Sequence, residues 1–161
     1  GIRNALDIID TARILRVLNA TNVVLQRIGI ERPRVAVSGI NPHASEDGLF
    51  GSEEAEIILP AIEKARAAGI DANGPFGADT MYLDKNFDAY VVMYHDQGHI
   101  PAKLVGFDGT AAFAIGTPLL FSSVAHGSAL DIAGRGKANA NALIWAITQI
   151  SGASTDPQPL N

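Results

Sequence analysis

Several residue types and patterns are absent from this chain of 161 residues, and each absence excludes a class of function. The sequence has no cysteine, which excludes disulfides, thiolate zinc sites and cysteine nucleophiles. No run of about eighteen apolar residues occurs, so we expect no membrane span and no membrane partner. Basic clusters are also absent, and the net charge of −5 argues against a polyanion-binding surface. A nucleic-acid partner is therefore not expected.

No secretory leader is evident, because Gly1 to Asn4 lead directly into a helical pattern. Together with the lack of cysteine this favours a reducing compartment, and we expect a cytoplasmic location. The composition is that of a folded domain, since 47% of the residues are hydrophobic and only 18% are charged. Residues 1–152 are predicted to form one domain, and residues 153–161 a frayed tail.

The order of the predicted elements indicates an α/β fold. Hydrophobic periodicity and capping residues predict helices over residues 4–28, 52–68 and 141–150. Ser52 is the expected N-cap of the second helix and Gly69 its C-cap. Extended apolar segments are predicted over residues 34–40, 70–76, 90–93, 110–115 and 119–124. Helices that alternate with buried strands are typical of a layered α/β unit.

The most informative segment runs from Met93 to Lys103 and has the sequence MYHDQGHIPAK. It places two imidazoles, a carboxylate, an amide and a lysine directly after a short apolar strand. Open α/β sheets present their chemistry at the carboxyl ends of strands. Residues 96–98 are predicted to form a turn, so that His95 projects from the tip of the strand into a cleft. The alternative is an exposed polar loop in which the histidines have no role.

His43 is the second candidate ligand, and it follows the predicted strand 34–40 in a loop stiffened by Pro42. All four histidines lie outside the predicted helices. If the two strands are close in the sheet, His43 and His95 can converge. Two imidazoles with a carboxylate suit a borderline divalent ion such as Zn²⁺, Co²⁺, Ni²⁺ or Mn²⁺. Asp79 is the best candidate for the carboxylate, with a helix N-cap as its alternative role.

A third constellation is the glycine-rich segment from His126 to Asn139. Small residues let a nucleotide approach the backbone closely, and free amides can meet a pyrophosphate. Asp131 could accept hydrogen bonds from both ribose hydroxyls and would repel a 2′-phosphate. The alternative is a plain glycine-rich connection before the last helix.

Taken in order, these motifs resemble the 4-hydroxythreonine-4-phosphate dehydrogenase (PdxA-like) family and its paralogues. The matching stretches are Asn41-Pro42-His43-Ala44, Phe50-Gly51 with Glu53-Glu54, Gly74-Pro75 with Ala78-Asp79-Thr80, and Met93 to Gly98 with Lys103. The segment from His126 to Asn139 is similar to the adenosine-binding loop of isopropylmalate and isocitrate dehydrogenases, which share a fold with this family. The resemblance implies their three-layer α/β/α fold. Because it covers only half of the family's usual length, we expect the chain to be the metal- and NAD-binding C-terminal half of a longer enzyme.

The resemblance also implies roles for individual residues. His43 and His95 would be two of three metal-binding histidines, the third lying upstream in the family, and the cation could be Zn²⁺, Co²⁺, Ni²⁺, Mn²⁺ or Mg²⁺. Asp79 would lie at the same site, and Lys103 and Asp79 would orient the substrate or move protons. NAD would be bound by His126, Gly127, Ser128, Asp131 and Asn139. In the family the metal site is completed across a dimer interface, so a homodimer is implied.

Two departures from the family concern the substrate. Ala112 aligns with the family's asparagine and Phe121 with its substrate-binding arginine, which is the natural fork for a phosphate group. Ala125 stands where the family commonly has aspartate. The sequence therefore predicts NAD-dependent oxidation of an unphosphorylated secondary alcohol, with or without decarboxylation, such as a hydroxy acid or terephthalate dihydrodiol. The alternatives are a 4-phosphohydroxy-threonine, 4-phosphothreonate or 4-phosphoerythronate dehydrogenase, or a metal- or nucleotide-binding fragment without turnover.

Overall fold

The computed structural model describes residues 1–106, 109–117, 121–124 and 127–151. The chain forms two compact units, Gly1–Pro101 and the part that begins at Ala102. The predicted tail, residues 153–161, lies outside the described residues.

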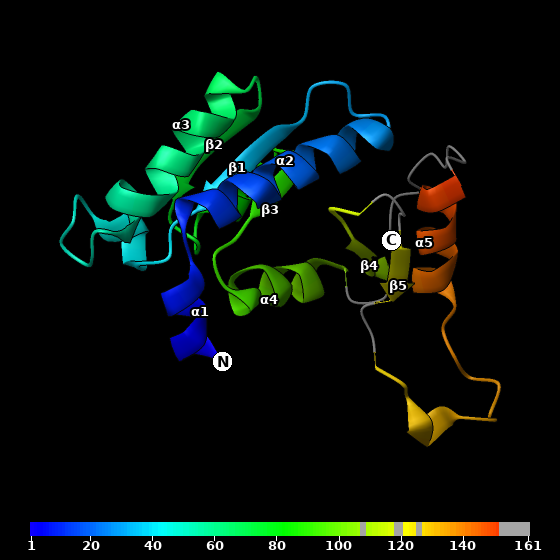
Figure 1. The fold of residues 1–161 in the computed structure, drawn as a ribbon. Helices are drawn as coiled ribbons and strands as arrows, with labels where there is room; N and C mark the ends of the chain where they lie inside the picture. The colour runs from blue at the N-terminus through cyan, green and yellow to red at the C-terminus, as the bar shows by residue number, and fades with distance from the viewer. Residues whose placement is uncertain (107–108, 118–120, 125–126, 152–161) are drawn as a thin grey trace. The chain divides into compact units, whose positions relative to one another are not determined.

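A three-stranded parallel sheet is the centre of the first unit (Figure 1). Its order is β2-β1-β3, with β1 at Arg34–Ser38, β2 at Asp71–Phe76 and β3 at Ala89–Val91. Val35 on the central strand pairs with both of its neighbours, and it is fully buried. A central parallel strand is shielded on both faces, which explains the continuous apolar run in its sequence.

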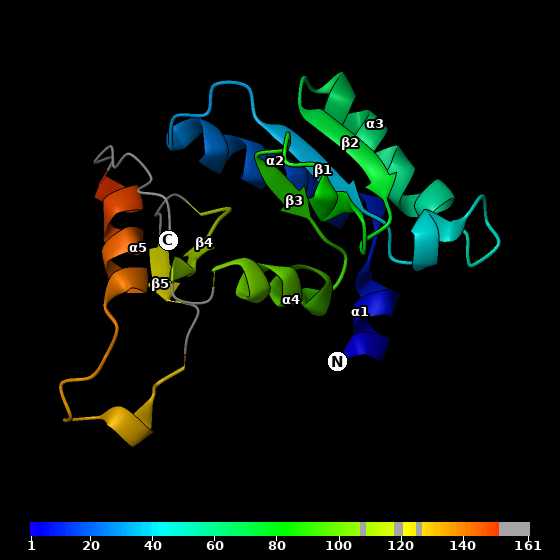
Figure 2. The same cartoon turned by 180° about the vertical axis from the view of Figure 1, so that it is seen from behind.

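Two helices, α2 (Thr11–Arg27) and α3 (Leu59–Ala67), pack together over one face of this sheet, as two opposite views show (Figure 1; Figure 2). Leu18 of α2 and Ile62 of α3 are fully buried between the helices and the strands. The remaining core is formed mainly by small and branched apolar residues: Ile14, Val35, Val37, Ile58, Ala61, Ala65, Ile70, Ala72 and Val91. The predicted α/β class is confirmed, and the sheet of the first unit is parallel.

The single helix predicted over residues 4–28 is wrong, because two helices occupy this region. α1 spans Ile2–Ile8, and α2 begins only at Thr11. Between them Ile9 is extended, and the side chain of Asp10 accepts a hydrogen bond from the backbone N–H of Arg13 at 2.6 Å. Asp10 is therefore an N-cap inside a continuous apolar pattern, and it starts a new helix.

The helix predicted over residues 52–68 is present, but its first part is wider than an α-helix. A π-helical turn, η2 at Glu54–Ile58, leads directly into α3. Gly69, with a φ of +85°, follows the end of α3 in the left-handed conformation that glycine adopts easily.

The turn predicted at residues 96–98 is wrong, because these residues form the first turn of α4 (His95–Gly106). His95 and His99 consequently lie in a helix, not outside one. Close packing accompanies this start: a Cβ on Gly98 would lie only 3.0 Å from Cγ2 of Val92. A glycine here lets the first turn of α4 lie against the segment that follows β3.

In the second unit, β4 (Ala111–Ala114) and β5 (Phe121–Val124) form an antiparallel pair that packs on α5 (Asn141–Ser151). Phe113 meets Trp145 of α5 edge-on, with ring centroids 6.2 Å apart. The alternation of exposure leaves the other face of the pair open to solvent. That face carries Ala112, Ala114, Phe121 and Ser123.

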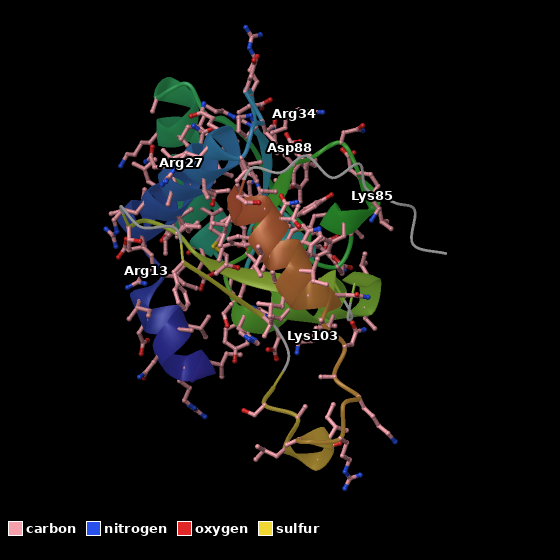
Figure 3. All side chains as sticks on the ribbon, turned by 90° about the vertical axis from the view of Figure 1, so that its right-hand side faces the viewer. Arg13, Arg27, Arg34, Lys85, Asp88 and Lys103 are labelled. Atoms are coloured by element: carbon pink, nitrogen blue, oxygen red, sulfur yellow. The ribbon has the colours of Figure 1, made fainter. Side chains whose placement is uncertain are left out.

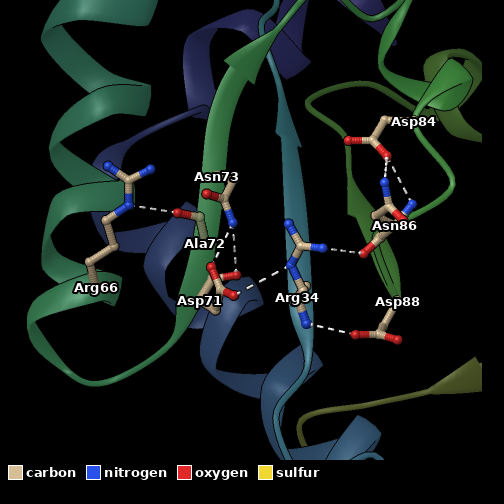
Figure 4. A network of polar contacts seen from close by, with 8 residues as sticks. All are labelled: Arg34, Arg66, Asp71, Ala72, Asn73, Asp84, Asn86 and Asp88. Atoms are coloured by element: carbon tan, nitrogen blue, oxygen red, sulfur yellow. Dashed lines mark hydrogen bonds and ion pairs between the residues drawn. The ribbon is translucent and has the colours of Figure 1, made fainter.

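A polar network surrounds the amino-terminal ends of the strands in the first unit (Figure 4). The backbone N–H of Arg34 donates to Asp88 at 2.7 Å, and its Nε lies 3.7 Å from a carboxylate oxygen of Asp71. Both side chains of the Arg34–Asp71 pair are about half exposed, so the pair contributes little to stability. The network instead fixes where the strands begin.

The labelled basic residues of the first unit are spread over α2, β1 and the loop before β3 (Figure 3). Arg13 and Arg27 lie near the two ends of α2, Arg34 lies on β1, and Lys85 lies in the loop before β3. These four cations therefore do not form a stripe along one element. No helix within the described residues has both the length and the apolar character to cross a lipid bilayer.

Candidate functional site

Three predicted site residues follow the carboxyl ends of three neighbouring strands. His43 follows β1, Asp79 follows β2, and His95 follows β3. Because the strands are parallel, their carboxyl ends meet at one edge of the sheet, where α/β proteins hold their ligands. All three residues belong to the first unit.

Gly39, directly after β1, links this edge to the end of β2 and to α4. Its backbone N–H donates to the carbonyl oxygen of Phe76 at the end of β2, at 2.7 Å. Its own carbonyl oxygen accepts a hydrogen bond from Nε2 of Gln97 in α4, at 3.0 Å. A Cβ at this position would lie 2.7 Å from Oε1 of Glu54 and 2.9 Å from the Cα of Ala44. Only glycine leaves room for the surrounding groups.

The loop that carries His43 has a left-handed backbone. Five consecutive residues, 43–47, have φ values between 46° and 72°, and none of them is glycine. For residues with a Cβ this conformation costs roughly 1–2 kcal/mol each, and it persists only where the surroundings hold it. The stored strain identifies 43–47 as a segment whose shape is imposed by its neighbours.

Two glutamates hold the start of this loop. Glu54 is only 3% exposed, and its Oε1 accepts hydrogen bonds from the backbone N–H groups of Ile40 and Asn41, both at 2.8 Å. The side-chain amide of Asn41 donates to Oε2 of Glu54 at 2.9 Å and to Oε2 of Glu53 at 2.7 Å. The hydrogen bond from Asn41 lowers the pKa of Glu53 below its ordinary value. Glu54 therefore holds the backbone that leads into His43, and Glu53 holds the side chain of Asn41 in the same segment.

Sequence reasoning missed this role. The glutamates at 53 and 54 follow a predicted N-cap, where carboxylates suit the helix dipole. Their position in a matching family motif was the available signal, but nothing local indicated that Glu54 is buried.

His95 has a partner that can orient its ring. Its Nδ1 lies 2.7 Å from Oδ1 of Asp96, and its side chain is exposed. With the proton on Nδ1, the imidazole donates to the carboxylate and leaves the Nε2 lone pair free for a metal ion. The ring of His99, one helical turn further, stacks on that of His95 with centroids 4.0 Å apart and planes 5° from parallel.

Asp79 lies in the loop after β2 next to the His43 segment. A Cβ on Gly77 would lie 2.8 Å from Oδ1 of Asp79 and 3.8 Å from the Cα of His43, so both residues flank Gly77. The alternative role of Asp79 as a helix N-cap is wrong, because the following 3-10 helix, η3 at Met81–Leu83, has Thr80 at its N-cap position and no side-chain cap bond.

The donor types at this edge fit a divalent cation in part. Two imidazoles and a carboxylate suit a borderline metal ion. Across the described ranges, however, no three histidine, aspartate or glutamate side chains are grouped closely enough to hold one. The convergence of His43 and His95 on a single ion stays a prediction.

Lys103 and the predicted cofactor loop belong to the second unit. Lys103 lies in α4, and His126 lies outside the described residues. Gly127 and Ser128 are exposed, and Asp131 lies in a short 3-10 helix, η5 at Leu130–Ile132. The side chain of Asn139 accepts a hydrogen bond from the backbone N–H of Asn141 at 2.9 Å, which supports a structural role at the start of α5. Binding of NAD by this loop stays a prediction.

Comparison with known proteins identifies the family. The profile described as "Pyridoxal phosphate biosynthetic protein PdxA" matches residues 1–150. D-threonate 4-phosphate dehydrogenase of Salmonella typhimurium is 46% identical over 150 residues, covering 91% of this chain and 46% of that protein. A 1,2-dihydroxy-3,5-cyclohexadiene-1,4-dicarboxylate dehydrogenase of Comamonas sp. is 45% identical over 147 residues, covering 91% of this chain and 47% of that protein.

The fold is similar as well. The crystal structure of 4-hydroxythreonine-4-phosphate dehydrogenase from Klebsiella pneumoniae matches with a TM-score of 0.82 and 42% identity, covering 92% of this chain and 48% of that one. The chain thus spans about half the length of the curated relatives it matches. With a family profile over residues 1–150 and such identities, the chain belongs to the PdxA family.

Proposed function

We propose that the protein is a divalent-metal- and NAD-dependent dehydrogenase that oxidises a secondary alcohol. The observation that carries this proposal is the position of His43, Asp79 and His95 at one edge of a parallel sheet, in a chain of the PdxA family. The two curated relatives named above are both called dehydrogenases. NAD would accept the hydride, and the protein would supply the placement of the reactants.

In this proposal His43 and His95 hold the cation. Asp96 would orient the His95 ring and leave its Nε2 available to a cation, and the loop held by Glu54 would present His43. A bound divalent cation would act as a Lewis acid on the alcohol and ketone oxygens. Asp79 and Lys103 orient the substrate or carry a proton. The relatives are about twice as long as this chain, so the remaining ligand and substrate contacts would come from elsewhere in the intact protein or from a second subunit of a homodimer.

The cofactor is proposed to be NAD, bound by the segment from His126 to Asn139. Asp131 is exposed in this loop, and a carboxylate there would repel the 2′-phosphate of NADP. Calorimetry with both dinucleotides on the intact protein tests this assignment, and Asp131→Asn should narrow the preference for NAD. Tighter binding of NADP than of NAD by the wild type would contradict the role of Asp131.

The preferred substrate is proposed to be an unphosphorylated hydroxy acid or a carboxylated diol. The supporting observation is that Ala112 and Phe121 lie on the same exposed face of the β4–β5 pair, so this face lacks both of the polar groups that the family pattern predicts. A second candidate is a phosphorylated hydroxy acid, which the 46% identity to a D-threonate 4-phosphate dehydrogenase favours.

Metal titration of the intact protein tests the site directly. We expect one divalent cation to bind, with affinity reduced in His43→Ala and in His95→Ala. Glu63→Ala is the control, because it also removes a possible metal-binding side chain, but at an exposed position on α3 that has no part in the proposed site. Equal affinity in all four proteins would contradict the proposed metal site. The isolated chain, without the remainder of the enzyme, is expected to be inactive.

A further inference from the structure

We infer that Gln97 is a positioning residue that holds the segments carrying His43 and His95 at a fixed separation. The inference rests on the proposed metal site and extends it to a side chain that would not touch the metal. It concerns residues of the first unit alone.

Both ends of the Gln97 side chain are used. Its Oε1 accepts hydrogen bonds from the backbone N–H groups of Met93 and Tyr94, each at 3.0 Å. Its Nε2 donates to the carbonyl oxygen of Gly39, at 3.0 Å. The hydroxyl of Ser38 also lies 3.4 Å from Oε1. One orientation of the amide satisfies all of these groups, because the N–H donors face the oxygen and the carbonyl faces the NH₂ group.

The position of Gln97 relative to the strands explains why these bonds matter. The β1–β3 ladder pairs Val35 with Ala89 and ends where Val37 pairs with Val91. Beyond this point the segments that lead to His43 and His95 are no longer paired as strands. Within the described residues, the hydrogen bonds between segments 38–47 and 92–99 are those of Gln97. Its side chain therefore links the two segments at the place where the β1–β3 pairing ends.

Gln97 is itself fixed in place. Its backbone carbonyl oxygen accepts a hydrogen bond from the phenol of Tyr82, at 2.7 Å. Burial raises the pKa of Tyr82, which keeps this donor protonated. Gly98, the next residue, packs closely on Val92. The bond from Tyr82 and the packing at Gly98 thus hold the backbone around Gln97 in place. Its side-chain amide can therefore fix the distance between the two segments that it contacts.

No other side chain of this length supplies the same set of bonds. Glutamate would accept from Met93 and Tyr94, but it has no donor for Gly39. Methionine has a similar volume and supplies neither group. If Gln97 only stabilised the fold, its loss would lower stability and leave the geometry of a bound metal unchanged. A positioning role predicts a change in that geometry.

The test is a Co²⁺ titration of the intact protein, followed by calorimetry and by visible absorption, which reports coordination geometry. Gln97→Met should bind Co²⁺ about tenfold to a hundredfold more weakly, the usual cost of losing a residue that supports metal ligands, and with an altered spectrum. Gln26→Met makes the same chemical change at an exposed position on α2. Ile62→Val lowers stability from the core. Both controls should keep the wild-type affinity and spectrum.

Wild-type affinity and spectrum in Gln97→Met would overturn the inference. If this variant does not fold, Gln97→Glu serves instead, because it keeps the acceptor for the two N–H groups and loses only the donor to Gly39. Its added negative charge favours cation binding, so weaker binding supports the inference and equal or tighter binding overturns it. Equal affinity in the wild type and His43→Ala, or no binding at all, would overturn the proposed metal site itself. Failure of the Gln97 inference alone would appear as weakening in His43→Ala and none in Gln97→Met.

Discussion

The buried carboxylate of Glu54 accepts a hydrogen bond from the backbone N–H of Asn41 at 2.8 Å, two residues before His43. Glu54 begins the π-helical turn that leads into α3, so the helix after the loop fixes the start of the loop. The strained left-handed segment 43–47 lies between these two anchors in the sequence. Core packing of α3 is in this way connected to the position of a candidate metal ligand.

Glu54→Gln should destabilise the protein. The glutamine keeps the size of the side chain, but its NH₂ group cannot accept a hydrogen bond. Depending on the orientation of the amide, either the backbone N–H groups of Ile40 and Asn41 or the side-chain amide of Asn41 loses this acceptor. A hydrogen bond to a charged group contributes about 1.5–3 kcal/mol, and we expect a loss of this size in the free energy of unfolding, measured by urea denaturation. Glu56→Gln, at an exposed position in the same helical turn, is the control and should change little. Equal stability of the two variants would show that the Glu54 contacts are not stabilising.

Gly39→Ala should be destabilising for a steric reason. The added Cβ would lie 2.9 Å from the backbone Cα of Ala44 and 2.7 Å from Oε1 of Glu54, and backbone cannot move aside as a flexible side chain can. Overpacking of this kind costs about 1–3 kcal/mol, and thermal unfolding measures it. Gly109→Ala, where a Cβ would meet nothing within 4 Å, is the matched control. A wild-type melting temperature in Gly39→Ala would show that the surroundings of Gly39 can accommodate a Cβ after all.

Glu53 should make stability depend on pH on the acid side. Its pKa in the folded protein lies below the ordinary value of 4.5, mainly because Asn41 donates to the carboxylate, whereas in the unfolded chain it returns to that value. The unfolded state therefore binds more protons in acid, and the stabilisation from Glu53 is present above the unfolded pKa and lost as the pH falls through the folded pKa. Urea denaturation at several pH values should show a shallower acid loss in Glu53→Gln. Glu63→Gln, exposed on α3, should follow the wild type.

The last prediction concerns the choice of substrate. Phe121 is 65% exposed on the open face of the β4–β5 pair, where the family pattern has an arginine. A charge-assisted bond contributes about 1.5–3 kcal/mol, so wild-type binding of a phosphorylated hydroxy acid should be weaker by about tenfold to a hundredfold than with an arginine there. Phe121→Arg in the intact enzyme should raise kcat/KM for the phosphorylated compound. Ile144→Arg adds the same charge at an exposed position on α5, and it should not raise kcat/KM for this compound.

Efficient wild-type turnover of the phosphorylated substrate, without a gain from Phe121→Arg, would contradict this prediction. Another cation in the intact protein would then have to bind the phosphate.

The sequence by itself determined the α/β class, the strands and the three motifs that follow them. Buried parallel strands are continuous apolar runs, and polar residues directly after such runs mark the carboxyl edge of a sheet, so both are readable from local pattern. The position of Asp10 as a second helix start was also readable in principle, but the continuous periodicity around it obscured the break.

Only the tertiary structure decided that α4 begins at His95, that residues 43–47 turn left-handed, and that Glu54 and Gln97 support the site. The last two depend on partners distant in sequence: Gln97 reaches Gly39 across 58 residues, and Glu54 reaches Ile40 across 14. Local propensity describes the conformation that a segment prefers in isolation. The strand order β2-β1-β3 decides which backbone groups of other segments lie beside it in the fold. Hydrogen bonds to those groups, formed where burial makes an unsatisfied amide costly, overrule the local preference.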